Sequence, residues 1–124
     1  INPNDARKLG IKGGDVVRIF NERGSVLGGA LLTERIREHV ISQDHGARVD
    51  SIVAGQGGLD RGGANNLICP GNTTSKNAPG EVTNGFLANI EKVDPFALAK
   101  KYPEAFSKDY EPADGMQATD RIVK

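Results

Sequence analysis

Residues 16–32 read VVRIFNERGSVLGGALL, and this stretch decides the class of fold that the sequence favours. Residues 16–20 are β-branched or aromatic except for one arginine, which is typical of a strand. Residues 21–24 have the composition of a turn, and residues 26–32 are mostly apolar again, as expected of a second strand. The stretch therefore predicts a β-hairpin.

Short elements are predicted before and after the hairpin. Asn4 can cap a helix over residues 5–9, and Gly10 can end it because glycine readily takes a positive φ. Residues 40–42 (VIS) favour a short strand. Residues 85–93 alternate apolar and polar side chains, as in a strand with one face in the core. The apolar face of that strand would carry Phe86, Ala88 and Ile90. Short strands joined by tight turns favour a small closed β-barrel over a parallel α/β sheet.

The composition changes near residue 94. Of the 16 glycines, 15 lie in residues 1–93, whereas four of the six aromatic residues lie in the last 31. The pair Asp94-Pro95 supplies an N-cap and a first helical residue for a helix that reaches about Lys101. We therefore expect a domain over residues 1–93 and a helical or irregular extension over residues 94–124.

Length and charge exclude several classes of protein. A chain of 124 residues corresponds to about one domain. Its 16 basic and 16 acidic residues give a net charge of zero, so no overall field attracts nucleic acid or an anionic membrane. The apolar stretches are far shorter than the roughly 20 residues of a membrane span. With one cysteine, the sequence has neither an internal disulfide nor a thiolate metal cage.

Residues 43–64 are rich in Gly, Asp, Asn and Gln, with only scattered apolar residues. Irregular stretches of this length are usually functional or disordered. The glycine-rich part, residues 55–60 (GQGGLD), lacks the third glycine of the dinucleotide fingerprint, and the sequence has no P-loop motif. Two interpretations stay open: a loop whose glycines let the backbone approach a phosphate or a heterocycle, or a flexible linker.

Several polar side chains could bind an anionic or heterocyclic ligand. Residues 73–77 (TTSKN) offer hydroxyl, ammonium and amide groups within five residues. Asp50 and Asp60 can accept hydrogen bonds from the N1–H and amino group of a guanine. Guanidinium groups that can neutralise a phosphate belong to Arg35, Arg37, Arg48 and Arg61. A solvated loop and surface ion pairs explain the same residues equally well.

The sequence gives little support to catalysis by its own side chains. Asp44 and His45 could belong to a hydrolase, but no nucleophile elbow of the G-x-S-x-G type is present. A histidine that hydrogen-bonds to a ligand or to the backbone is the simpler interpretation. Cys69 ends the apolar run of residues 67–69, which favours a buried small side chain over a reactive thiol. We assign no catalytic residue and no metal ligand.

Short motifs over residues 2–91, about three quarters of the chain, resemble one known family when they are taken in order. They are NPNDA (2–6), LGIKGGDVV (9–17), the hairpin that closes on Gly24, TERI (33–36), HGA (45–47), LDRGG (59–63), NNL (65–67), TSKN (74–77) and the strand at 86–91. The set resembles the C-terminal molybdopterin-dinucleotide-binding domain of molybdenum and tungsten enzymes of the dimethyl sulfoxide reductase superfamily. LDRGG and TSKN are similar to its pyrogallol transhydroxylase-like and trimethylamine-oxide-reductase-like branches.

The resemblance implies a mainly β fold, a double-psi β-barrel with short helices and a C-terminal extension. It implies that the domain binds the guanine dinucleotide form of molybdopterin, whose dithiolene holds molybdenum or tungsten. The redox chemistry would then belong to the metal in a longer oxidoreductase chain. The residues implied to line the cofactor are His45, Gly46, Arg48, Asp60, Asn66, Thr74, Ser75, Lys76 and Asn77, with Asp50 as a further candidate for the guanine. Some family members have tryptophan where this chain has Arg48.

The implied partners are the preceding domains of the same longer polypeptide and, as a candidate, an iron–sulfur subunit; nucleic acid and a membrane span are not expected. The isolated chain is not expected to be an enzyme. The alternative is a stand-alone double-psi barrel that binds another protein through its aromatic-rich extension. The cofactor-binding interpretation requires residues 45–48, 66 and 74–77 to face one groove, whereas the interaction module has no such requirement.

Overall fold

The structure is a computed structural model that describes residues 1–53, 58–77, 80 and 84–106. The chain divides into two compact units, Ile1–Val93 and Asp94–Lys124. Among the described residues, no helix is long and apolar enough to cross a membrane.

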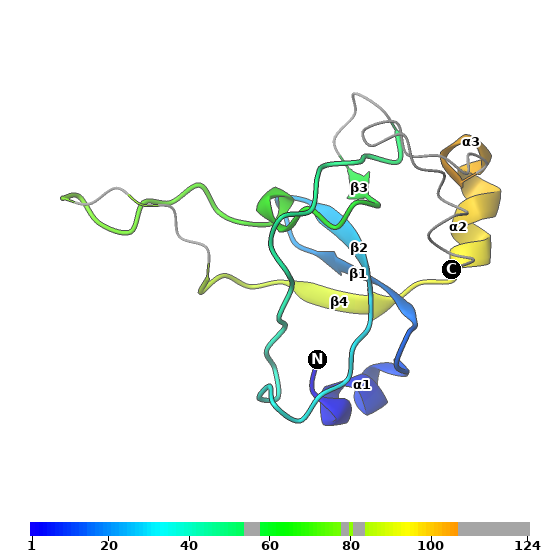
Figure 1. Cartoon of the computed structure of the whole chain (residues 1–124), viewed down its shortest axis with the longest axis horizontal. Coiled ribbons are helices and arrows are strands. Elements are labelled where there is room, and N and C mark those ends of the chain that lie inside the picture. Colours follow the sequence, from blue (N-terminus) through cyan, green and yellow to red (C-terminus); the bar gives the residue numbers. More distant parts are fainter. Residues whose placement is uncertain (54–57, 78–79, 81–83, 107–124) are drawn as a thin grey trace. The chain divides into compact units, whose positions relative to one another are not determined.

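Four strands of the first unit form one sheet in the order β3-β2-β1-β4 (Figure 1). The strands are β1 (Val16–Phe20), β2 (Ser25–Gly29), β3 (Leu59–Asp60) and β4 (Asn89–Lys92). β1 pairs antiparallel with β2 and with β4, whereas β3 runs parallel to β2. The mainly β fold with short helices is confirmed, while closure into a double-psi barrel stays a prediction.

The predicted hairpin is present, but its second strand ends earlier than expected. β2 stops at Gly29 instead of continuing to Leu32. The backbone of Ala30 exchanges hydrogen bonds with Asp15 and Gly14, and Thr33 N–H donates to the carbonyl of Ile1. The backbone pairing of the hairpin therefore continues to Ala30, after which the chain pairs with the N-terminal segment.

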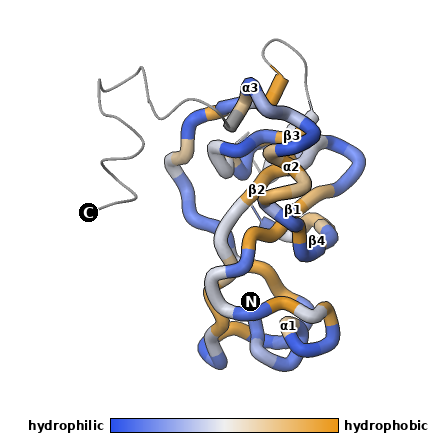
Figure 2. Tube along the Cα trace, turned by 90° about the vertical axis from the view of Figure 1, so that its right-hand side faces the viewer, coloured by the Kyte–Doolittle hydropathy of each residue, from blue (hydrophilic) through white to orange (hydrophobic). Residues whose placement is uncertain are grey.

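The core follows from the alternation along β1. Val17 and Ile19 point to one face, where Val17 packs in a cluster with Ala6, Ile11 and Ala30 and Ile19 packs in a second cluster with Val26 and Ile68. On the other face the Arg18 guanidinium lies 4.0 Å from the centroid of the Phe20 ring. The tube coloured by hydropathy shows the apolar residues that β1 and β2 contribute (Figure 2).

Helix α1 (Pro3–Leu9) begins earlier than predicted, so Asn4 is not its N-cap. The cap is Asn2, whose Oδ1 accepts a hydrogen bond from Asn4 N–H at 2.8 Å. Pro3 fits the first helical position because it has no N–H to leave unpaired there. Asn4 is instead the second residue of the helix, and its side-chain amide donates to Glu38 at 2.6 Å. Gly10 ends the helix at φ +69°, as expected.

Two other predicted strands differ in part from the structure. Residues 40–42 have no strand pairing, so the strand predicted there is wrong. β4 covers only the second half of the alternating segment, yet the alternation itself is confirmed. Phe86, Ala88 and Ile90 pack against the cluster around Ile19, whereas Leu87 is 89% exposed.

The second unit begins with the predicted helix. α2 (Pro95–Lys101) starts after Asp94, whose Oδ1 accepts a hydrogen bond from Phe96 N–H at 2.9 Å. Two lysines in the last turn favour the helix because they oppose its negative C-terminal dipole. A short helix, α3 (Pro103–Phe106), follows.

Candidate functional site

A pocket of about 580 Å³ opens between two parts of the first unit that are distant in sequence. Residues 39–43 and His45 line it, together with Asn65 of η1 (Asn65–Leu67), Ile68, Cys69 and residues 84–88. Ile19 of β1 and Ile68 give it an apolar part. This volume lies within the range of ordinary small-molecule sites. We refer to it below as the polar pocket.

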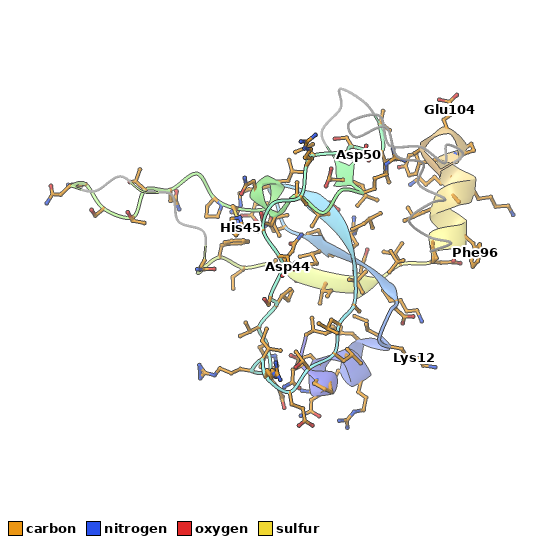
Figure 3. All side chains as sticks on the ribbon, viewed as in Figure 1. Lys12, Asp44, His45, Asp50, Phe96 and Glu104 are labelled. Atoms are coloured by element: carbon orange, nitrogen blue, oxygen red, sulfur yellow. The ribbon has the colours of Figure 1, made fainter. Side chains whose placement is uncertain are left out.

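His45 is the residue from the predicted set that lines the polar pocket, and Figure 3 shows it near η1. On η1 itself the lining residue is Asn65, which is half-buried, whereas the predicted Asn66 is exposed and is not among the lining residues. The resemblance indicated the second asparagine of the pair, and its contact with the cofactor stays a prediction. Cys69, expected to be buried, is half-buried and lines the pocket.

Gln43 also lines the polar pocket and was missed by sequence reasoning. Its Nε2 donates a hydrogen bond to the carbonyl of Gly63 at 2.8 Å, which fixes the orientation of the amide. Its Oε1 is buried and has no hydrogen-bond partner within the described part of the chain. A buried acceptor without a donor is costly, so this side of the pocket suits a ligand or a water that supplies an N–H or O–H.

Asp60 lies on β3 and is fully buried. One carboxylate oxygen accepts a hydrogen bond from the backbone N–H of Asp50, and the other accepts from Ala64 N–H at 3.0 Å. The side chain of Asp50 pairs with Arg61 at 2.7 Å on the surface, as the ion-pair interpretation expected. A Cβ at Gly62 would collide with the carbonyl oxygen of Arg48, so the backbone of the 48–50 segment packs directly on the turn after β3.

The remaining predicted residues lie on the arm, which we define as the described residues between Ile68 and Leu87, namely 69–77, 80 and 84–86. Figure 1 shows residues 69–77 leading away from η1 and residues 84–86 leading into β4. Thr74, Ser75, Lys76 and Asn77 are exposed on this arm. Thr74 N–H donates to the carbonyl of Gly80 at 2.7 Å, and Gly80 N–H donates to Thr74 Oγ1 at 3.2 Å, which closes a local turn.

The predicted set is therefore not brought into one groove among the described residues. His45 lies in the polar pocket, Arg48 and Asp60 belong to the packed turn beside β3, and residues 74–77 lie on the arm. Gly46, next to His45, has φ +96°, a conformation that favours glycine.

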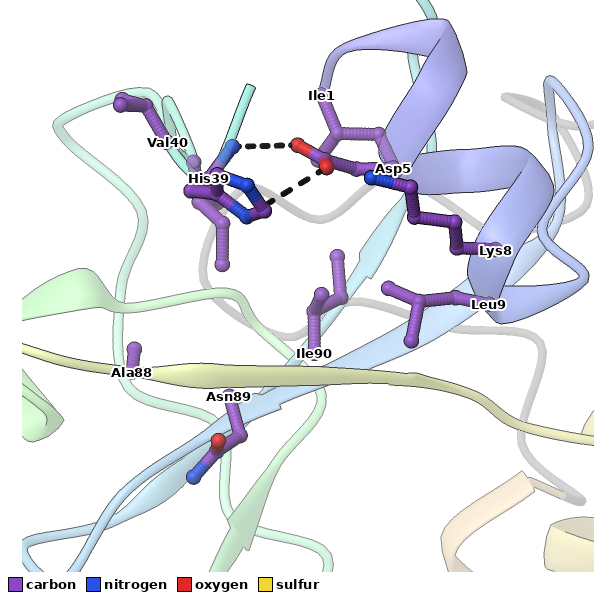
Figure 4. A pocket seen from close by; sticks show the side chains of 10 residues that line it. Ile1, Asp5, Lys8, Leu9, His39, Val40, Ala88, Asn89 and Ile90 are labelled. Atoms are coloured by element: carbon purple, nitrogen blue, oxygen red, sulfur yellow. Dashed lines mark hydrogen bonds and ion pairs between the residues drawn. The ribbon is translucent and has the colours of Figure 1, made fainter. Parts of the chain in front are cut away.

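A second pocket, of about 350 Å³, lies between α1, residues 39–41 and residues 88–90 (Figure 4). Its rim carries Asp5, whose carboxylate accepts a hydrogen bond from His39 N–H at 2.6 Å. Ligand atoms of Asp5, Glu38 and His39 lie within 4.8 Å of one another. Glu38 is already bound by Asn4 and lies 3.5 Å from the Lys8 ammonium, and these contacts lower the pKa of its carboxyl. Nothing in this cluster indicates a bound metal.

The described residues of the first unit thus form a small β domain with a pocket of about 580 Å³. Comparison with known proteins gives the family: residues 1–83 match the family described as Molydopterin dinucleotide binding domain. The chain belongs to this family, and its role is to bind a molybdopterin cofactor. This membership supports the cofactor-binding interpretation and not the stand-alone interaction module.

Relatives in the dimethyl sulfoxide reductase superfamily agree with this assignment. The chain is 39% identical over 94 residues to the trimethylamine-N-oxide reductase of Haemophilus influenzae. It is 38% identical over 95 residues to the pyrogallol hydroxytransferase large subunit of Pelobacter acidigallici, and 39% identical over 93 residues to the dimethyl sulfoxide/trimethylamine N-oxide reductase of Rhodobacter capsulatus. The matches cover 74–76% of this chain but only 11% of each relative. The chain thus corresponds to a small part of these longer proteins.

The polar pocket is compatible with part of such a cofactor. Guanine and pterin rings carry ring N–H and amino groups that can donate hydrogen bonds. The Oε1 of Gln43, which has no partner among the described residues, can accept such a bond. Asn65 adds a donor and an acceptor, and the half-buried Phe86 adds an apolar lining surface. The hydrogen-bonding groups of the pocket therefore suit a heterocycle. The cationic side chains suited to phosphates, Arg48 and Lys76, are exposed and are not among the residues that line the pocket.

Proposed function

We propose that this chain binds the guanine dinucleotide of a molybdopterin cofactor that carries molybdenum or tungsten. We also propose that its strands close into a double-psi β-barrel. The observation that carries the proposal is the polar pocket, with its unused buried acceptor on Gln43, in a domain of the molybdopterin dinucleotide-binding family. Residues 1–93 form the binding domain in this proposal, and residues 94–124 are an extension.

The binding residues that we propose are those implied by the family resemblance, with Asn65 added because it lines the pocket. His45 and Gly46 bind at the pocket, Arg48 neutralises phosphate charge, and residues 74–77 hydrogen-bond to the dinucleotide from the arm. On η1 we propose that Asn65, which lines the pocket, makes closer contact than Asn66. The role we propose for Asp60 is support of the segment that carries Asp50 instead of a contact with the guanine, because its carboxylate is fully buried and both oxygens accept backbone N–H groups.

The longer protein is proposed to be an oxidoreductase or a hydroxyl-transferring enzyme, as the names of its relatives suggest. When bound, the metal and its dithiolenes supply the redox chemistry, and this chain binds and orients the dinucleotide. Preceding domains of the same polypeptide complete the site, and an iron–sulfur subunit is a candidate partner.

The test is the nucleotide content of the purified full-length protein. After acid denaturation, released guanine nucleotide is quantified by chromatography, and molybdenum and tungsten are measured by mass spectrometry. We expect close to one guanine nucleotide for each nucleotide-binding position and a substantial loss in Lys76→Ala. Lys12→Ala is the control, because Lys12 is an exposed lysine on the segment before β1. A wild-type protein that carries the metal but no guanine nucleotide would overturn the proposal.

A further inference from the structure

The turn between β1 and β2 contacts both ends of the arm. Asn21 Nδ2 donates one hydrogen bond to the carbonyl of Ile68 at 2.8 Å and another to the carbonyl of Leu87 at 3.1 Å. Ile68 immediately precedes the arm and Leu87 immediately follows it. A side-chain amide nitrogen carries two hydrogens, so both bonds can form at once. One side chain thus joins two backbone positions that are 19 residues apart in the sequence.

Arg23 reinforces the same connection. Its Nε donates to the carbonyl of Ile68 at 2.8 Å, and its guanidinium lies 5.5 Å from the centroid of the Phe86 ring. Asn21 Oδ1 accepts from the backbone N–H of Arg23 at 2.9 Å, which orders the turn itself. Arg23 therefore also contacts one residue at each end of the arm.

Gly24 lets the turn approach η1 this closely. A Cβ at position 24 would lie 2.6 Å from the carbonyl oxygen of Leu67, which is shorter than any real contact of this kind. The contact is with backbone, which cannot turn aside as a flexible side chain could. The three residues Asn21, Arg23 and Gly24 thus act as one unit, which we call the clasp.

The two ends of the arm that the clasp joins also line the polar pocket. Ile68 and Cys69 line it where the arm begins, and residues 84–88 line it where the arm ends. Asn21, Arg23 and Gly24 are not among the lining residues, so they do not contact a ligand there. Asn21, Arg23 and Gly24 can therefore affect a ligand only indirectly, by fixing where the two ends of the arm lie.

We infer that the clasp positions the arm and one side of the polar pocket for the dinucleotide, so that Asn21 and Arg23 are positioning residues for cofactor retention. This inference rests on the proposed function. The two bonds of Asn21 set the separation of the arm's two ends, and hence the width of the pocket. They also set the direction in which the arm leaves the sheet with residues 74–77.

The test compares Asn21→Asp with Asn2→Asp in the full-length protein loaded with cofactor. Aspartate keeps the Oδ1 acceptor for Arg23 N–H and nearly the same volume, but it has no hydrogens for the carbonyls of Ile68 and Leu87. Asn2→Asp is the matched control. It loses one bond of the same kind, to the carbonyl of Ile36 at 2.8 Å, and keeps the oxygen that caps α1.

Two measurements are made on each variant: deuterium exchange of peptides covering residues 65–69 and 84–88, and the rate at which guanine nucleotide leaves the protein. For Asn21→Asp we expect about tenfold faster exchange in these peptides, from the loss of two hydrogen bonds, and a similarly faster release of nucleotide. Asn2→Asp should change neither. Thermal melting of both variants shows that the comparison is made on folded protein.

Unchanged exchange at residues 65–69 and 84–88 would overturn the inference, and so would faster exchange with unchanged nucleotide release. Failure of the proposed function is distinguishable, because the wild-type protein would then release no guanine nucleotide at all. If Asn21→Asp does not fold, Arg23→Gln tests the same clasp through the bond to Ile68. Its control is Arg7→Gln, which removes a surface bond to Asn4 at 2.7 Å. The inference requires that the rates of local exchange and of nucleotide release both rise in Arg23→Gln and that neither rises in Arg7→Gln.

Discussion

The buried carboxylate of Asp60 accepts a hydrogen bond of 3.0 Å from the backbone N–H of Ala64, four residues further along the chain. The same carboxylate accepts from the backbone N–H of Asp50 on another segment. A single side chain therefore joins β3, the turn that leads to η1 and the segment after His45. Since these segments carry Arg48 and Asn65, the order of the proposed binding region depends on Asp60.

Replacing Asp60 by alanine should destabilise the domain strongly. The buried N–H of Ala64 would lose its acceptor at about 1–3 kcal/mol, the part-buried N–H of Asp50 would lose its acceptor too, and a cavity would add to the cost. The measurement is the thermal midpoint of the full-length protein compared with that of Asp50→Ala. The control removes a surface ion pair with Arg61, worth less than about 1 kcal/mol. Equal midpoints for the two variants would contradict the structural role of Asp60.

Gly24→Ala should also destabilise the domain, because the added Cβ would meet the backbone carbonyl of Leu67 at 2.6 Å. Relief requires the hairpin turn and η1 to move apart, at a cost of about 1–3 kcal/mol. Gly28→Ala on β2 is the control, since a Cβ there meets no atom within 4 Å. Thermal melting of the two variants checks the prediction, and a smaller shift for Gly24→Ala than for Gly28→Ala would refute it.

Asp15 should make part of the stability depend on pH. A hydrogen bond of 2.8 Å from the backbone N–H of Lys12, and then the ammonium of Lys92 at 3.2 Å, lower the pKa of the Asp15 carboxyl below its ordinary value. A carboxylate with a depressed pKa stabilises the fold above its ordinary pKa of about 4, and this contribution is lost as the pH falls through the lowered folded value.

The variant Asp15→Asn isolates this effect. Its thermal midpoint should lie below that of the wild type at pH 7, and the difference should shrink as the pH is lowered from about 5 to 2. Asp44→Asn, the same carboxylate-to-amide change at an exposed residue, is the control and should show a smaller pH-dependent difference. A constant difference between wild type and Asp15→Asn across this range would show that the ion pair contributes nothing.

The elements that could be predicted from the sequence are those fixed by neighbouring residues. The β1–β2 hairpin follows from a β-branched run and a turn of Asn, Glu, Arg and Gly, and α2 follows from Asp94-Pro95. The alternation of Phe86, Ala88 and Ile90 also predicts the buried face, because strand periodicity is a local property. Asn2 was missed as the cap of α1 because Asn2 and Asn4 are equally suitable by type. Only the position of Pro3 separates them.

The parts of the candidate site that could not be predicted depend on contacts between distant residues. Gln43 owes its orientation to a carbonyl 20 residues away, and Asn21 bonds to carbonyls 47 and 66 residues away. No periodicity or motif records such a pairing, because it arises when the sheet and η1 pack together. The predicted strand at residues 40–42 failed for a related reason. Val40 and Ile41 line pockets beside β4 and pair with no strand.

The two asparagines of η1 offer the most direct test of the polar pocket. Asn65 lines the pocket and Asn66 is exposed, although they are adjacent and chemically identical. If the pocket holds a ring of the cofactor, Asn65→Leu removes a hydrogen-bonding group from the contact and should weaken dinucleotide binding about tenfold, or roughly 1.4 kcal/mol. Asn66→Leu should bind nearly as well as the wild type. Guanine nucleotide retained by the full-length protein after extended dialysis measures the difference. The opposite order, with Asn66→Leu losing the nucleotide, would place the cofactor outside this pocket and favour the residue that the resemblance indicated.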